Sequence, residues 1–392
     1  MIGKKVLVWL FSALLLGSIV PLSQAQAQSL SIVILVSDNE ADSAIAEELA
    51  TLLNASVVIT TWGVYDPNVT AEIMEYAPDK VIIIGGPDAV PEDYKTELEE
   101  LRIPYVRWYG KDRYGTNLDV LKNTIEEFPE LFEDVKVVIT HGRDLGAIKQ
   151  ARGIEGKKFI IYVDNNLTNT TEVLGTLVKT RNVIILKSQL MNNGTAERIR
   201  ERIRERVRDG NITEENLEVT PEMAWQAIEF AINRTETAKE MLDNLTIPDA
   251  TKLLELAEEK IQIANESYNE GNYGKAYGQA IAAKAHAEAV IRLASKEWKS
   301  VLSVSHEKLD TRLEREIHKL EVKIKVLEKA GIDVTEIKTI LESAKNAIQG
   351  KDYNTAMNDI ERAKNMLRDK FIQERGKIRG MNLPGGTGRG RP

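Results

Sequence analysis

Short apolar runs alternate with longer amphipathic segments through the first half of the chain. The runs are Ile32 to Val36, Val57 to Thr60, Val81 to Ile84, Val135 to Thr140, Phe159 to Val163 and Val183 to Leu186, and Tyr105 to Trp108 is an additional short candidate. They are too short for helices, and their consecutive apolar and β-branched positions predict strands buried on both faces of parallel sheets. The segments between them have helical period, so we expect right-handed β-α-β units. The first predicted helix ends at Leu53, and the next begins at Pro91. Further helices are predicted over Leu118 to Phe128, His141 to Arg152 and Val173 to Thr180, and another from Ala196.

The same order of elements occurs twice. Val81 to Ile84 matches Val183 to Leu186 at an offset of 102 residues, and Val57 to Thr60 matches Phe159 to Tyr162 at the same offset. Two tandem Rossmann-like α/β repeats, over residues 28–115 and 116–210, are the simplest interpretation.

Strand signals stop around Asp209 to Thr220, and from Pro221 every segment has helical period. We therefore expect an all-α domain of helical hairpins or coiled coil over residues 221–376. A Tyr-x-x-Ala pattern at Tyr273 recurs at Tyr353, and it resembles the turn of paired helices in tetratricopeptide-type hairpins, although no 34-residue period accompanies it.

An apolar seam runs through residues 306–330. Its members step by four, four, three, four and three residues; they are Leu309, Leu313, Ile317, Leu320, Ile324 and Leu327. This spacing predicts a coiled coil, through which two copies of the chain could form a homo-oligomer. The seam belongs either to one helix from Ala276 to Ala330 or to a second helix after a break near Ser300 to Ser305.

The two ends of the sequence have distinct compositions. Residues 1–27 combine Lys4 and Lys5, an apolar run and a small-residue site before Gln28, which predicts a cleaved secretory signal peptide. An uncleaved anchor is the alternative, and no membrane span is expected in the mature chain. Residues 377–392 are rich in glycine with only basic charges, which predicts a disordered tail.

Composition limits the function. The 392-residue chain has a net charge of -8, which disfavours nucleic-acid binding, and no cysteine for disulfides or thiolate metal sites. An excess of Asn-x-Ser/Thr sequons favours a secreted, glycosylated protein at the cell surface. The sequons are at Asn54, Asn68, Asn166, Asn169, Asn193, Asn211, Asn233, Asn244 and Asn265.

The most informative stretch runs from Val81 to Asn117. A strand ends at Gly85-Gly86, a helix follows Pro91, and a Gly-Lys-Asp-Arg-Tyr block begins at Gly110. Ligands bind at the carboxyl ends of such strands in open α/β sheets, although Gly85-Gly86 could equally be a plain tight turn. Neither a dinucleotide fingerprint nor a Walker sequence is present, and we expect no cofactor.

Residues Ile82 to Pro91 and Arg107 to Thr116 resemble the cell wall binding repeat type 2 family, and the resemblance extends more weakly over about residues 31–205. It implies noncatalytic attachment to a cell envelope polymer or surface-layer (S-layer) glycan. The ligand-binding residues would be Gly85, Gly86, Asp88, Lys111, Asp112, Arg113 and Tyr114. Arg113 could instead form an internal salt bridge between the repeats, with Asp112 fixing it. The second repeat departs from the pattern, since Lys187-Ser188 replaces Gly-Gly.

An enzymatic alternative is an envelope hydrolase using Asp38, Glu40 and Asp42, which follow the first strand and could also hold a divalent cation. Helix capping explains the same residues more simply. His141 is the only histidine expected near a cleft, and no catalytic triad is supported. We therefore expect no enzyme and no metal site, but a secreted binding protein with a helical stalk or assembly module. A purely structural, oligomerising surface protein is the alternative.

Overall fold

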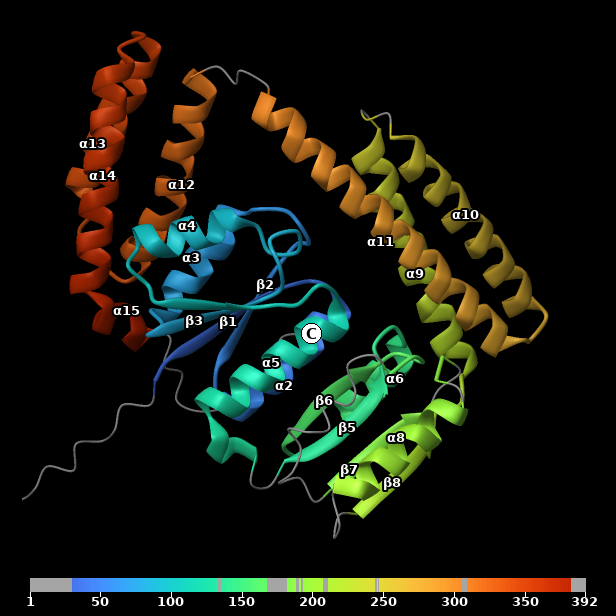
Figure 1. Ribbon diagram of the computed structural model, residues 1–392. Coiled ribbons are helices and arrows are strands. Elements are labelled where there is room, and N and C mark those ends of the chain that lie inside the picture. The colour runs from blue at the N-terminus through green and yellow to red at the C-terminus, as the bar shows by residue number, and fades with distance from the viewer. Residues whose placement is uncertain are drawn as a thin grey trace, which may run out of the picture. The chain divides into compact units, whose positions relative to one another are not determined.

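A computed structural model describes residues 30–132, 135–167, 182–187, 190–191, 193–206, 211–243, 245, 247–304 and 309–381. The predicted signal peptide and the predicted helix at Val173 to Thr180 lie outside these residues. The fold class is confirmed: two α/β units with parallel sheets precede an all-helical region (Figure 1). Among the described residues, no helix is both long enough and apolar enough to cross a membrane.

The first unit is a four-stranded parallel sheet in the order β2-β1-β3-β4. Its strands are β1 (Ile32–Ser37), β2 (Ser56–Thr60), β3 (Lys80–Ile84) and β4 (Tyr105–Trp108), and its helices are α2 (Glu40–Leu53), α3 (Pro67–Tyr76) and α4 (Glu92–Glu100). All four strands were predicted, whereas α3 was not. Alternate residues of β1 belong to different cores: Ile34 packs in a cluster with α2, and Val33 in a cluster with α3 and α4. Both faces of the sheet are therefore covered, as the apolar runs indicated.

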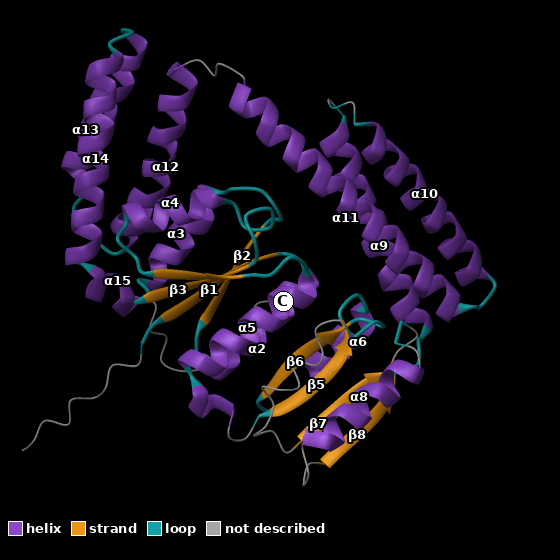
Figure 2. Cartoon of the chain, viewed as in Figure 1, coloured by secondary structure: helices purple, strands orange, loops and turns teal. Residues whose placement is uncertain are grey.

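The second unit repeats this arrangement with the strand order β6-β5-β7-β8 (Figure 2). Its elements are α5 (Arg113–Glu127), the 3-10 turn η1 (Pro129–Phe132), β5 (Lys136–His141), α6 (Leu145–Gly153), β6 (Lys158–Val163), β7 (Asn182–Lys187), α8 (Asn193–Arg206) and β8 (Asn211–Asn216). The expectation that strands stop near Asp209 was wrong. The β8 strand is polar and mostly exposed because it pairs only with β7 at the sheet edge, so it carries no buried-strand signal.

The first three helices of the second half pack against one another: α9 (Pro221–Leu242), α10 (Pro248–Asn269) and α11 (Tyr273–Val304). Alanines fill their contacts, among them Ala231, Ala264 and Ala280, and small side chains allow helices to approach closely. Helix α11 is described as far as Val304 and the next helix from Leu309, so Ser300 to Val304 are helical, and residues 305–308, where the predicted break would fall, lie outside the described residues.

The remaining helices are α12 (Leu309–Lys329), α13 (Thr335–Gln349), α14 (Tyr353–Gln373) and α15 (Arg375–Met381). Five seam residues of α12, from Leu313 to Leu327, are buried in one apolar cluster with α3, α4, α13 and α14. Lys323 of α12 forms a buried ion pair with Glu97 of α4. The chain itself thus covers the seam, and the prediction of a homo-oligomeric coiled coil over 306–330 is corrected. Residues 377–381 are also helical rather than part of a disordered tail, and Ile378 is buried.

Candidate functional site

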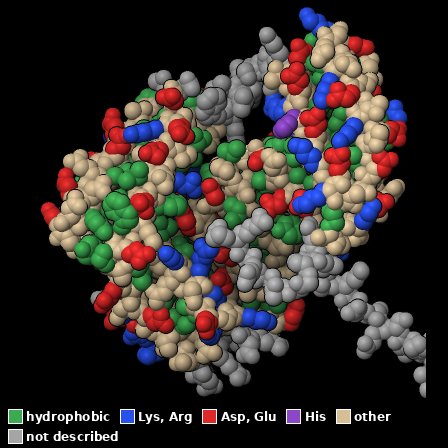
Figure 3. All heavy atoms as spheres, turned by 180° about the vertical axis from the view of Figure 1, so that it is seen from behind, with side chains coloured by type: hydrophobic (Ala, Val, Ile, Leu, Met, Phe, Trp, Pro, Cys, Tyr) green, Lys and Arg blue, Asp and Glu red, His purple; other side chains and the backbone are tan. Residues whose placement is uncertain are grey.

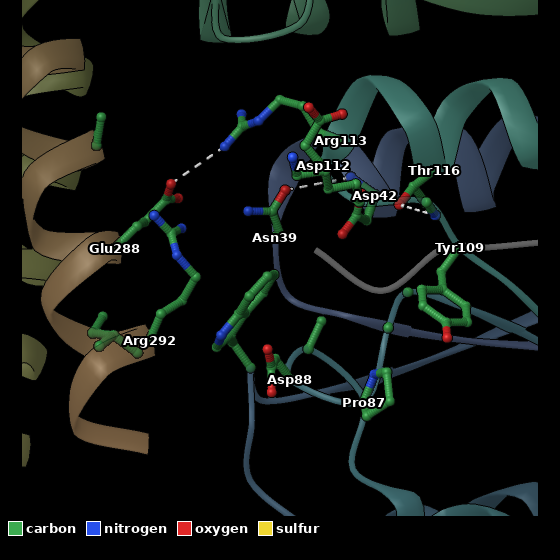
Figure 4. A pocket seen from close by; sticks show the side chains of 18 of the residues that line it. Asn39, Asp42, Pro87, Asp88, Tyr109, Asp112, Arg113, Thr116, Glu288 and Arg292 are labelled. Atoms are coloured by element: carbon green, nitrogen blue, oxygen red, sulfur yellow. Dashed lines mark hydrogen bonds and ion pairs between the residues drawn. The ribbon is translucent and has the colours of Figure 1, made fainter. Parts of the chain in front are cut away.

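The topology of the first sheet places a crevice at one edge. In the order β2-β1-β3-β4, the connections from β1 and β3 leave in opposite directions, and a crevice opens between the carboxyl ends of those two strands. A cavity of about 500 Å³ lies at this position (Figure 4). Six of the seven predicted ligand-binding residues line it: Gly85, Gly86, Asp88, Lys111, Asp112 and Arg113.

The Gly-Gly turn after β3 requires glycine at position 85 and leaves room for a neighbouring ring at position 86. Gly85 has a φ of +118°, which L side chains rarely adopt. A Cβ on Gly86 would lie 3.0 Å from the ring of Tyr109, so the bare backbone lets this ring lie beside the turn. Arg107 holds the loop by donating to the carbonyl oxygens of Gly85 (3.0 Å) and Val90 (2.8 Å). Two segments of the sequence motif therefore build one wall of the cavity.

The Gly-Lys-Asp-Arg-Tyr block folds back on itself at the start of α5. A Cβ on Gly110 would lie 2.3 Å from the carbonyl carbon of Gly115, so only glycine fits there. Asp112 caps α5, since its Oδ1 accepts a 2.8 Å hydrogen bond from the Gly115 N–H. Asp112 therefore supports the loop rather than fixing Arg113, while the neighbouring Lys111 is exposed at the cavity.

Arg113 forms the internal bridge that was the alternative to ligand binding. Its Nη1 donates to the carbonyl of Gly142 after β5 (2.9 Å), and its Nη2 lies 3.3 Å from Glu288 of α11. This guanidinium joins three parts of the chain and also lines the cavity. Tyr114 was predicted as a ligand-binding residue but does not line this cavity; its ring packs edge-on against His141, with centroids 6.4 Å apart.

Three arginines of the cavity were missed by sequence reasoning: Arg143 follows β5, Arg234 lies on α9 and Arg292 on α11. Burial chiefly lowers the pKa of Arg292, and the positive charges of Arg113 and Arg143 lower it further, against the opposite effect of Glu288 and Asp88. Basic side chains from separate elements thus line one cavity, where they outnumber its carboxylates. Clusters of this kind bind anions.

The acidic residues that follow β1 have different roles. Asn39, and not Asp38, caps α2 by accepting from the N–H groups of Ala41 and Asp42. Asp38 lies 3.4 Å from Arg234 and accepts from the Trp62 N–H, and Glu40 pairs with Lys284 at 2.6 Å. In the part of the chain that the structure describes, no group of three or more acidic or histidine side chains could hold a metal ion.

Asp42 is the exceptional acid. Its side chain lines the cavity, it is only 6% exposed, and its Oδ1 has no hydrogen-bond partner among the described residues. Burial raises the pKa of this carboxyl to about 6; Arg113 opposes that shift, and the negative charge of Glu288 adds to it.

At the second sheet, α11 fills the equivalent edge. The hydroxyl of Tyr277 donates to Asp144 Oδ1 (2.7 Å) and accepts from the Gly146 N–H (2.5 Å) at the start of α6. The Gly146 position is also closed by Met223, whose Cε would lie 2.3 Å from an added Cβ. A tyrosine of α11 therefore occupies, at the second sheet, the place where the first sheet has an open cavity.

The sequons occupy different environments. Asn54, Asn68, Asn166, Asn211 and Asn233 are exposed, and Asn265 is half-buried. Asn169 and Asn244 lie outside the described residues, as does the side chain of Asn193. The Asn68 amide also donates to Asp66 Oδ1 at 2.8 Å.

Comparisons with known proteins do not assign the chain to a family. No family model matches the chain. An uncharacterised protein of Methanocaldococcus jannaschii is 38% identical over 171 residues, which cover 43% of this chain and 49% of the relative, so the match spans about half of that protein's length. Among solved structures, Cwp6 from Clostridium difficile is similar over 47% of this chain and 30% of its own, with 21% identity and a TM-score of 0.39.

Proposed function

We propose that this protein is a secreted, noncatalytic cell-surface protein that attaches to an anionic envelope polymer or surface-layer glycan through the cavity of its first α/β unit. The observation that carries the proposal is the convergence of Gly85, Gly86, Asp88, Lys111, Asp112 and Arg113 on one cavity at the carboxyl edge of the sheet. These residues come from two motif segments separated in sequence by a whole helix.

The charges around the cavity support an anionic ligand. The chain as a whole has a net charge of -8, yet the basic side chains that line this cavity outnumber its carboxylates. The five basic residues are Lys111, Arg113, Arg143, Arg234 and Arg292, and the four acidic ones are Asp42, Asp88, Asp112 and Glu288. On the face shown in Figure 3, acidic and basic side chains are interspersed. A local gathering of cations on an acidic protein steers anions to that place.

In this proposal, the helical second half of the chain also contributes residues to the binding cavity. Helices α9 and α11 supply Arg234, Glu288 and Arg292 to the cavity wall. The helical region is therefore proposed to complete the binding site as well as to serve as a stalk or assembly module. The exposed sequons are compatible with a glycosylated exterior at the cell surface.

Cosedimentation of the full mature chain with isolated cell envelopes tests the proposal. We expect retention at low salt that weakens as salt is added, because the attraction is electrostatic. Lys111→Ala with Arg143→Ala should reduce retention at least about tenfold, since a charge-assisted hydrogen bond contributes roughly 1.5–3 kcal/mol.

The matched control is Lys252→Ala with Lys325→Ala, which removes the same charge from exposed positions on α10 and α12. It should leave retention unchanged. Failure of the wild-type chain to cosediment at low salt would contradict the proposed function.

A further inference from the structure

The cavity presents more than positive charge to a ligand. Two aromatic side chains line it, Trp62 from the loop after β2 and Tyr109 from the loop after β4, and Tyr109 is 47% exposed. Flat aromatic surfaces of this kind pack against apolar faces of ligands while polar groups set the orientation. The site therefore combines an apolar wall with the arginines.

Asp42 adds a requirement that a simple anion does not meet. Its carboxyl points into the cavity, where Figure 4 places it beside Asn39 and Thr116. Its Oδ1 is buried without a hydrogen-bond partner among the described residues, so the carboxyl has unused bonding capacity that a ligand hydroxyl reaching this carboxyl would use. Above pH 6, inorganic phosphate or an isolated carboxylate would be repelled by the ionised Asp42, whereas a hydroxyl group can bond to it in either protonation state. At pH 5.5, where Asp42 is mostly protonated, a sugar differs from phosphate by the apolar ring face that it offers to Trp62.

The arginines define the opposite requirement. Arg143 and Arg292 line the same cavity from the second α/β unit and from α11, and both side chains are exposed. Arg113 already bonds to the Gly142 carbonyl and to Glu288. An anionic group on the ligand can therefore pair with Arg143 and Arg292.

We propose that the cavity binds one acidic sugar unit, with its anionic group on Arg143 and Arg292, a ring hydroxyl on the Asp42 carboxyl, and one ring face against Trp62. This rests on the proposed function and narrows it. The volume of about 500 Å³ lies in the range of small-molecule sites, so the unit is either a polymer end or a free sugar acid.

The neighbours of Asp42 make this binding sensitive to pH. The groups that act on it are Arg113 from α5, Glu288 and Lys284 from α11, and Glu40 from its own helix, and the nearby Tyr162 hydroxyl of β6 donates to the Ala41 carbonyl. Above pH 6, Asp42 becomes charged and repels the anionic group of the ligand. Affinity is therefore expected to fall several-fold between pH 5 and pH 8, and Asp42→Asn should remove most of that fall.

Calorimetric titration of the full chain at pH 5.5 tests the inference with four probes: glucuronic acid, glucose 1-phosphate, glucose and inorganic phosphate. The two acidic sugars should bind at least about tenfold more tightly than glucose or phosphate. Arg143→Ala and Trp62→Ala should each weaken them about tenfold, while Lys252→Ala leaves them unchanged. Melting temperatures establish that each variant is folded, and Trp62→Phe replaces Trp62→Ala if the latter is not.

Equal binding of phosphate and glucose 1-phosphate would mean an adventitious anion only and would overturn the inference. Envelope retention without binding of either acidic sugar would overturn it too, while leaving the proposed function intact. If the acidic sugars bind and also release the protein from envelopes, the ligand is a polymer end. If the acidic sugars bind without releasing the protein from envelopes, the inference stands with a free sugar acid as ligand. If they bind but the protein is not retained on envelopes at all, the inference also stands with a free sugar acid as ligand, and the proposed function fails.

Discussion

The hydroxyl of Tyr277 lies 2.7 Å from the Oδ1 of Asp144 and fixes α11 to the carboxyl edge of the second sheet. Further along the same helix, Lys284 and Glu288 pair with Glu40 and Arg113 at the edge of the first sheet. One helix thus reaches the corresponding edges of both repeats. It fills the second and leaves a cavity at the first.

Removing the Tyr277 hydroxyl should destabilise the protein. In Tyr277→Phe, Asp144 loses its buried donor and the Gly146 N–H loses its acceptor, which costs about 1–3 kcal/mol of unfolding free energy. Urea denaturation measures the change. Tyr273→Phe, on the half-buried ring at the start of α11, is the matched control and should cost much less. Equal losses in the two variants would refute a special role for the Tyr277 hydroxyl.

Asp42 should make stability depend on pH in a direction opposite to that of a salt-bridged acid. Its pKa is raised from 3.8 to about 6, so the folded state binds the proton more tightly than the unfolded state. The stabilisation from this group is present below pH 4 and is lost as pH rises through 6, by at most about 3 kcal/mol. Asp42→Asn should therefore match the wild type in thermal melts at pH 4 and exceed it at pH 8. A variant that is less stable than the wild type at pH 8 contradicts this.

Gly86 should matter more for binding than for stability. A Cβ there lies 3.0 Å from the ring of Tyr109, and the exposed ring can swing away at little cost. We expect Gly86→Ala to lower the unfolding free energy by less than about 1 kcal/mol and to weaken envelope retention several-fold. Gly153→Ala, where a Cβ meets nothing within 4 Å, should change neither. Unchanged retention in Gly86→Ala would remove Tyr109 from the site.

The seam of α12 should behave as an internal core. Ile317 is buried against the chain's own helices, so Ile317→Ala is expected to cost about 2–4 kcal/mol of unfolding free energy. Light scattering should show the same molar mass for the variant and the wild type, since this surface joins no second copy. Glu314→Ala, at an exposed position on the same helix, is the control. A change from dimer to monomer in Ile317→Ala would restore the coiled-coil interpretation.

The strands could be predicted because burial on both faces leaves a mark in sequence. Runs such as Val81 to Ile84 are apolar at every position, which few other local structures explain. The strand β8 was missed because its edge position allows polar residues, and α3 was missed although Pro67 opens it and Asp66 caps it. The Asp66-Pro67 pair is a recognisable helix start that received no weight.

The candidate site was only half predictable. Gly85 and Gly86 follow from the position of the Gly-Gly turn at a strand end, and Lys111 follows from the resemblance of the Gly-Lys-Asp-Arg-Tyr block to a known repeat. Arg143 and Arg292 lie far away in sequence, and only the packing of the second unit and α11 brings them to the cavity. The spacing of the α12 seam likewise indicated an apolar stripe, but periodicity carries no information on which surface covers it.

The burial of α12 against α3 and α4 has a consequence for how the chain is made. The N-terminal unit leaves the ribosome first, yet the helices that cover its outer layer begin about 200 residues after its last strand. Contacts this distant in sequence raise the contact order and slow folding. Until Leu309–Lys329 emerges, the first unit therefore exposes apolar surface, and it is in this interval that a chaperone would be most needed.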